Sequence, residues 1–123
     1  MDALLWVLQV LLGVAFVAAG VMHVGQSRER LLQRLPWVED VSASTVKVIG
    51  TAELAGGLGV VLPAATGIAP ILIPIAAAGL AVVMLGAIFT HFRRREPAGI
   101  AITGVLFALA VVVAWGRFGP YSY

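Results

Sequence analysis

Three side chains capable of acid–base chemistry lie in otherwise apolar stretches of this sequence: His23, Glu53 and His91. Glu53 is the only formal charge between residues 48 and 92, and its stretch reads VIGTAELAGGLGVVLP. A carboxyl group and two imidazoles can exchange protons with a ligand or hold it by hydrogen bonds. We therefore interpret Glu53, His91 and His23 as candidate catalytic residues.

Small residues around Glu53 would leave space for a neighbouring helix or a ligand. Gly50 and Gly57 lie three and four residues from Glu53, so all three share one helical face. The simplest alternative is that Glu53 only joins two helices by hydrogen bonding. In the functional interpretation, the residues expected to contact a ligand are Lys47, Gly50, Thr51, Gly57 and Ala87.

Two histidines and a carboxylate are also ligand types for metals, and histidines are common axial ligands of haem. No fixed spacing joins these residues, so we predict no metal site, and haem or a metal held by His23 and His91 stays an alternative. The chain has no cysteine, which excludes disulfides, thiol redox chemistry and iron–sulfur ligation. A redox role would therefore require a bound cofactor or a partner chain.

The composition indicates a membrane protein. Hydrophobic residues make up 61% of the 123 residues and charged residues only 11%, against about 45–50% and about 25% in soluble domains. A transmembrane helix needs about 20 apolar residues. The uncharged runs predict an all-α, integral membrane four-helix bundle of two helical hairpins. It forms a single membrane domain, residues 1–123, with spans at about 3–24, 45–62, 70–92 and 98–116.

The segment SRERLLQRLPWVEDVSAS predicts a short interfacial amphipathic helix between spans 1 and 2. It should end near Pro36, and Ser42 or Ser44 should cap the second span. Aromatic residues are expected at the opposite edge of the bilayer, where Arg117 can extend its charged end to the interface. They are Trp6, Trp115, Tyr121 and Tyr123.

Seven of the eight Lys and Arg residues lie in the first and third connections between spans, with Lys47 at the far edge of the first. The positive-inside rule then puts these loops in the cytoplasm and both termini outside. His23, Lys47, Glu53 and His91 would all fall in the cytoplasmic half of the membrane. The basic loops should contact membrane lipids, and we see no pattern that indicates nucleic-acid binding. Stretches GVMHVGQSRER and GAIFTHFRRRE also resemble each other, which predicts comparable positions for the two histidines.

Most of the chain resembles the DoxX-like family of small four-span bacterial membrane proteins. The stretches that carry the resemblance are GVAFVAAGVMH, VIGTAELAGGLGVVLP, LAVVMLGAIFTHFRRRE and the last span ending in WGRF. The resemblance implies a compact bundle in the bacterial inner membrane and site positions at Glu53 and His91. A lysine is common in the family at the place of His23, so this histidine is a departure.

The resemblance also implies a membrane redox or quinone-linked component that binds a small lipophilic ligand, with quinone as the possible cofactor. Three alternatives remain open on the residues alone. The chain could be an acid–base enzyme, such as an isomerase, acting on a lipophilic substrate. It could be a proton-coupled small transporter, or a chaperone or structural subunit without chemistry. Its glycine strips permit a homo-oligomer or association with partner membrane subunits.

Overall fold

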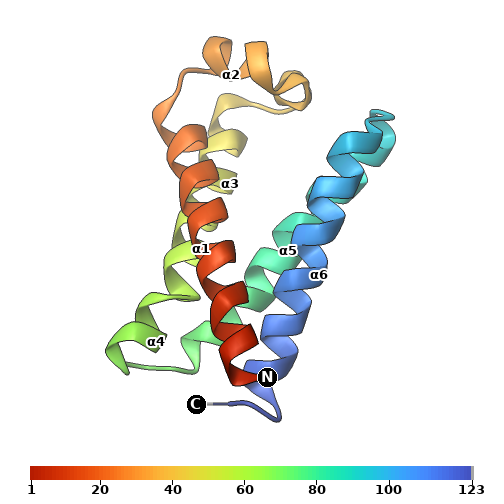
Figure 1. Ribbon diagram of the computed structural model, residues 1–123. Coiled ribbons are helices and arrows are strands. Elements are labelled where there is room, and N and C mark those ends of the chain that lie inside the picture. The colour runs from red at the N-terminus through yellow and green to blue at the C-terminus, as the bar shows by residue number, and fades with distance from the viewer. Residues whose placement is uncertain (123) are drawn as a thin grey trace.

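A computed structural model describes residues 1–122, so the expectation for Tyr123 lies outside the described residues. Four long apolar helices dominate this part of the chain (Figure 1). They are α1 (Asp2–Gly25), α3 (Ala43–Gly59), α5 (Leu72–Arg93) and α6 (Pro97–Phe118). Helices α1, α5 and α6 are each long and apolar enough to cross a membrane. The same holds for α3 when it is taken together with the short helix that follows it, as residues Ala43–Thr66. The predicted all-helical fold with four spans is confirmed.

Three shorter elements connect the long helices. They are α2 (Arg28–Arg34), the 3-10 helix η1 (Pro36–Asp40) and α4 (Leu62–Thr66). The amphipathic helix predicted between the first two spans is therefore present as α2, and Pro36 begins the next element as expected. Of the two candidate caps, the Ser42 side chain accepts from the Thr45 N–H at the start of α3. The turn expected after the second span contains α4. Gly67, which follows the last residue of α4 and caps it, has a positive φ of 72°.

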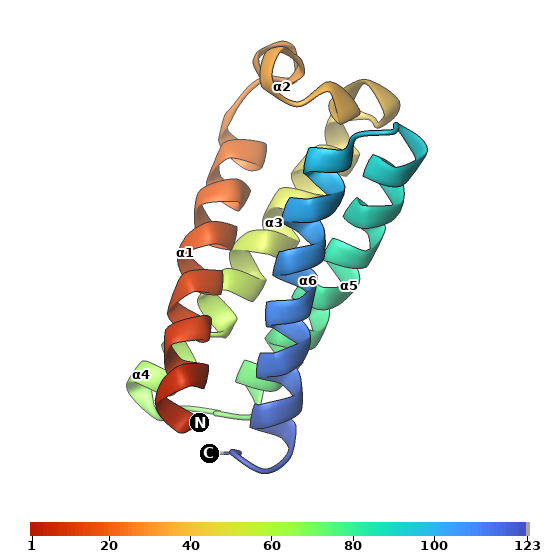
Figure 2. The same ribbon diagram turned by 45° about the vertical axis from the view of Figure 1, so that its right-hand side comes forward.

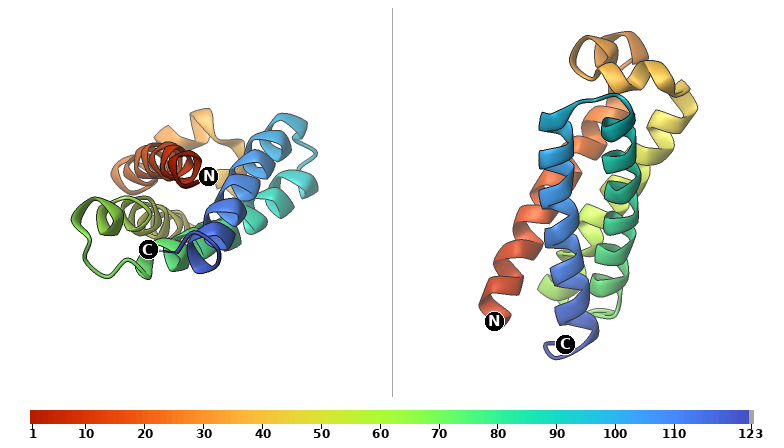
Figure 3. Two further views of the ribbon diagram at one scale, coloured as in Figure 1. Left: turned by 60° about the horizontal axis from the view of Figure 1, so that its bottom comes forward. Right: turned by 90° about the vertical axis from the view of Figure 1, so that its right-hand side faces the viewer.

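The long helices pair as two hairpins, α1 with α3 and α5 with α6, and the pairs meet mainly through α3 and α5. Figures 2 and 3 show the four helices running along one common direction. Both termini lie at one end of the bundle, and α2 lies at the other. We call the end that carries α2 and the α5–α6 turn the basic end, because the arginine-rich connections lie there.

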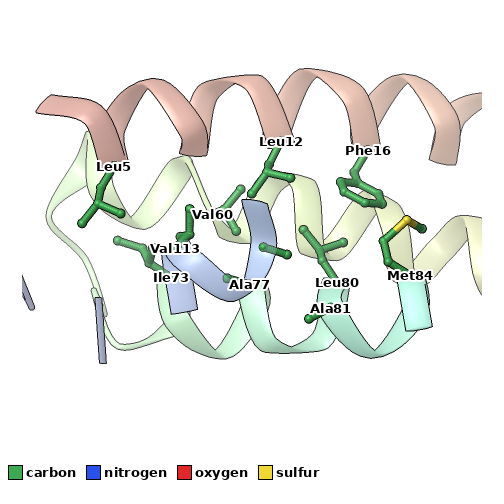
Figure 4. Close-up of a cluster of buried hydrophobic side chains, with 11 residues drawn as sticks. Leu5, Leu12, Phe16, Val60, Ile73, Ala77, Leu80, Ala81, Met84 and Val113 are labelled. Carbon is green, nitrogen blue, oxygen red and sulfur yellow. The ribbon is translucent and has the colours of Figure 1, made fainter. Parts of the chain in front are cut away.

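The interior of the bundle is a continuous apolar core. Figure 4 shows its side chains from α1, α5 and α6, and from Val60 just after α3, converging between the helices. Large apolar side chains also cover the outside of the long helices, as Val14, Val82 and Phe92 are each about 70% exposed. Such an exterior suits hydrocarbon rather than water, as expected for a membrane-spanning bundle.

Glycines allow α1 and α3 to approach closely at two levels. A Cβ atom on Gly20 would lie 2.7 Å from the Gly50 carbonyl oxygen, and one on Gly57 would lie 3.1 Å from the Gly13 carbonyl oxygen. Side chains larger than hydrogen would push the helix backbones apart at these points. The close approach at Gly20 and Gly50 lies one helical turn from His23 and Glu53 and sets the distance between them.

The end of the bundle opposite α2 is closed by buried polar contacts. Arg117 was expected to extend to the membrane interface, but it is only 2% exposed. Its Nε donates to Gln9 Oε1 at 2.7 Å, and its Nη1 donates to Asp2 Oδ1 at 2.5 Å. The Gln9 side chain in turn donates to the Val60 carbonyl oxygen. The expectation was wrong because Asp2 and Gln9 on α1, together with the Tyr121 carbonyl oxygen, accept hydrogen bonds from the guanidinium group within the protein.

Candidate functional site

His23 and Glu53 form a buried hydrogen-bonded pair. His23 Nδ1 lies 2.5 Å from Glu53 Oε1, and the two side chains are 8% and 5% exposed. One residue belongs to the last turn of α1 and the other to the middle of α3. A proton shared between an imidazole and a carboxyl group can move towards either partner, so the pair can act as a proton donor or acceptor.

A cavity of about 500 Å³ adjoins this pair between the helices. Its walls come from α1, η1, α3, α5 and α6 and are mainly apolar, with Phe16, Met84 and Leu106 among them. The cavity includes His23, Glu53 and His91, so the structure brings together all three candidate catalytic residues around one space. The predicted ligand contact Ala87 also lines it.

His91 reaches the cavity from the end of α5. Its Nδ1 lies 2.8 Å from an oxygen of Glu96 in the turn that leads into α6. A side chain on Gly99 would collide with the His91 ring, so this glycine lets the start of α6 pass beside the imidazole. The two histidines share one cavity, but His23 is held by a neighbouring helix and His91 by its own turn.

An ion-pair network crosses the basic end above the cavity. Arg94 contacts Asp40 at 2.7 Å, Glu39 at 3.0 Å and Glu96 at 3.4 Å. The hydrogen bonds that Arg94 donates to Asp40 and Glu39 raise the pKa of Arg94 further above its usual range. The hydrogen bond from His91 lowers the pKa of Glu96, and Arg94 adds to this effect. The network ties η1 to the α5–α6 turn.

The segment from α2 to η1 covers the cavity at the basic end. The Trp37 and His23 rings are nearly perpendicular, with their centroids 5.6 Å apart, and Trp37 also lines the cavity with Leu35 and Val41. Sequence reasoning missed this role because it interpreted Trp37 only as an interfacial residue. The mixture of apolar residues and charges in the segment was the available signal, since a purely solvated loop needs no tryptophan.

The other predicted ligand contacts lie outside the cavity lining. Lys47 is exposed and borders a separate hollow at the basic end. Thr51 is exposed and donates its hydroxyl hydrogen to the Lys47 carbonyl oxygen. Gly50 and Gly57 lie in the contact between α1 and α3. These four residues shape or flank the helix that carries Glu53 without reaching the cavity.

Within residues 1–122, no group of three or more His, Asp or Glu side chains comes close enough together to hold a metal ion. His23, Glu53 and His91 border the same cavity, but only the first two are in contact. Each histidine uses Nδ1 for a carboxylate oxygen. The geometry therefore favours hydrogen bonding and proton exchange with a molecule inside the cavity.

A protein-family model for the DoxX-like family matches residues 7–113. The chain belongs to the DoxX-like family. The match spans all four long helices of this DoxX-like protein and includes His23, Glu53 and His91. Together with the four apolar helices, it indicates a multi-pass membrane protein. Comparisons with curated proteins and with solved structures found no match.

Proposed function

We propose that this DoxX-like protein binds a small lipophilic molecule of the quinone class and exchanges protons with its head group. The observation that carries the proposal is the His23–Glu53 pair, buried at the wall of an apolar cavity inside a membrane bundle. A volume of about 500 Å³ falls within the range of small-molecule sites, which usually combine apolar walls with a few polar groups.

The polar groups suit a ring that carries two carbonyl oxygens. Glu53 and His23 approach the cavity from α3 and α1, and His91 approaches it from α5. Thr90 and Thr103 also line the cavity, but their hydroxyls donate to backbone carbonyls of their own helices. The carboxyl–imidazole pair and His91 are therefore the groups that would bind the two ends of a quinone head.

Reduction of a quinone to a quinol takes up two electrons and two protons. This chain would supply the protons through Glu53 and His23. Its cysteine-free sequence offers no thiol or iron–sulfur centre that could supply the electrons. The electrons would come from a partner membrane subunit or a soluble reductant. The proposal thus assigns binding and proton exchange to this chain and electron supply to a partner.

Binding of a short-chain quinone to the protein in lipid nanodiscs tests the proposal. We expect Glu53→Gln and His91→Gln to weaken binding at least about ten-fold, since hydrogen bonds to charged groups contribute about 1.5–3 kcal/mol. Thr51→Val is the matched control, because Thr51 lies on the same helix as Glu53 but outside the cavity. Absence of saturable binding to the unmodified protein would overturn the proposal.

Acid–base catalysis on a lipophilic substrate is a second candidate. It is favoured by the contact between His23 and Glu53, which needs no electron carrier to move a proton. In that case Glu53→Gln would abolish turnover of the substrate while leaving its binding largely intact. The quinone proposal instead expects binding itself to fall.

We also propose that the basic end faces the cytoplasm of a bacterial inner membrane, with both termini outside. Seven of the eight Lys and Arg residues lie in the two connections at the basic end or in the helix turns next to them, and the positive-inside rule supports this orientation. The cavity would then open in the cytoplasmic half. Labelling of a cysteine introduced at Ser44, in sealed vesicles of known orientation, checks the assignment.

A further inference from the structure

A second hollow lies at the basic end, next to the cavity. Its volume is about 450 Å³, and it is lined by the end of α1, by α2 and by the start of α3. In contrast to the cavity, its lining includes the charged side chains of Arg28, Glu29 and Lys47. We call this space the vestibule.

His23 is the one residue that the described linings of the cavity and the vestibule have in common. Its Nδ1 contacts Glu53, which lines only the cavity. Within residues 1–122, the other ring nitrogen of His23 has no hydrogen-bond partner. The imidazole therefore stands between a charged hollow on one side and an apolar one on the other.

Two residues of the vestibule lining carry a buried polar atom without a protein hydrogen-bond partner. In the described part of the chain, the buried atoms Gln26 Oε1 and Arg28 Nε make no hydrogen bond, and both residues line the vestibule. One is an acceptor and the other a donor, and buried groups of both kinds are usually satisfied by ordered water. A hollow with both kinds of group suits a small cluster of water molecules.

We propose that the vestibule is a water-filled route by which protons reach the ligand in the cavity through His23. A hydronium ion in the vestibule gives a proton to His23 Nε2 and is left as water, and the His23 Nδ1–H bond breaks as Glu53 Oε1 gains that hydrogen as a proton. His23 is then neutral and carries its hydrogen on Nε2. Glu53 then passes the proton to an oxygen atom of the ligand and returns to its carboxylate form. The last step rests on the proposed function, but water access to His23 does not.

The charged groups around this route differ on its two sides. Arg28 and Glu29 face the vestibule from α2, and Lys47 faces it from α3. Glu53 from α3 and His91 from α5 face the cavity. The His23–Glu53 hydrogen bond therefore connects the vestibule to the cavity. A bulky group can be placed in either hollow, and the effect of each can be measured separately.

Exchange of the His23 ring proton with water, followed by NMR of histidine-labelled protein in nanodiscs, tests the route. The chain has two histidines, so His91→Gln assigns the signals. A cysteine introduced at Ala43, in the vestibule, is modified with a bulky charged thiol reagent, which has no other target in this cysteine-free chain. The matched control carries the cysteine at Ala87, which lines the cavity.

We expect modification at Ala43 to slow His23 exchange at least ten-fold and modification at Ala87 to leave it unchanged. Lys47→Cys provides a second vestibule position, should the first variant misfold. The route is refuted if only the cavity block slows exchange, or if His23 does not exchange with water at all. Quinone binding is measured on the unmodified protein, so failure of the proposed function is seen separately from failure of the route.

Discussion

Replacing Gly20 by alanine should separate α1 from α3 and lengthen and weaken the His23–Glu53 hydrogen bond. A Cβ atom at Gly20 would lie 2.7 Å from the Gly50 oxygen and 2.8 Å from the Leu54 nitrogen. Both are backbone atoms, so neither can rotate away. Ordinary contacts begin at 3.4 Å, so the helices must part from 2.7 to 3.4 Å, or by about 0.7 Å, at this level.

The same separation acts one turn further along, at His23 and Glu53. Their contact of 2.5 Å would lengthen to about 3.2 Å, near the limit of an N–H···O hydrogen bond. Overpacking costs about 1–3 kcal/mol, and loss of a hydrogen bond between membrane helices costs about 0.6–1.7 kcal/mol. Alanine has a higher helix propensity than glycine, which offsets about 1 kcal/mol of this loss. We therefore expect a net loss of about 1–4 kcal/mol in the free energy of unfolding.

Gly104→Ala is the matched control, because a Cβ atom there meets nothing within 4 Å. It should leave stability unchanged or raise it slightly. Both variants are unfolded in mixed micelles and followed by circular dichroism, and the His23 signal is followed by histidine NMR. Equal stability of the two variants, with an unchanged His23 signal, would refute the reasoning about the helix crossing.

Three further predictions concern the ends of the bundle. Arg94→Gln removes the contacts to Glu39 and Asp40, so backbone hydrogen exchange of residues 36–40 should accelerate. Arg93→Gln is the control and should not change this exchange, because Arg93 lies over the Phe89 ring. Because the His91 hydrogen bond lowers the pKa of Glu96, the stabilisation by Glu96 is complete above its ordinary value of 4.5 and is lost as pH falls through the lowered value. Acid unfolding of Glu96→Gln should lack this component, and an identical pH profile would contradict the assignment. Arg117→Leu removes the donor to Gln9 Oε1 and should lower the free energy of unfolding by about 1–3 kcal/mol, whereas an unchanged melting temperature would show that the buried contact does not stabilise the bundle.

The elements of the fold could be predicted because the membrane constrains the sequence directly. A span must be apolar over about 20 residues, so runs without charges locate the helices to within a few residues. The proline after α2 and the serine before α3 similarly mark local boundaries. These signals depend only on neighbouring residues.

The partners of polar residues were harder to predict, because they come from elements distant in the sequence. His23 and Glu53 were expected to lie near one another from their similar depth, and they are in contact. Depth does not specify rotation about a helix axis, however, and Lys47 and Thr51 face away from the cavity. The burial of Arg117 was not predicted for a related reason: the sequence does not say whether an arginine near a helix end reaches the membrane interface or a buried partner.

The contact between Gln9 and Arg117 has a consequence for the biogenesis of the protein. It joins the first long helix to the last, across 108 positions of the chain. Until α6 is synthesised and inserted, Gln9 Oε1 lacks the guanidinium donor, although the Gln9 amide can already donate to the Val60 carbonyl oxygen. A polar or charged side chain in lipid is costly, so docking of α6 gains free energy when Arg117 reaches Gln9. The two hairpins can each form early, but this end of the bundle closes only after α6 has been inserted.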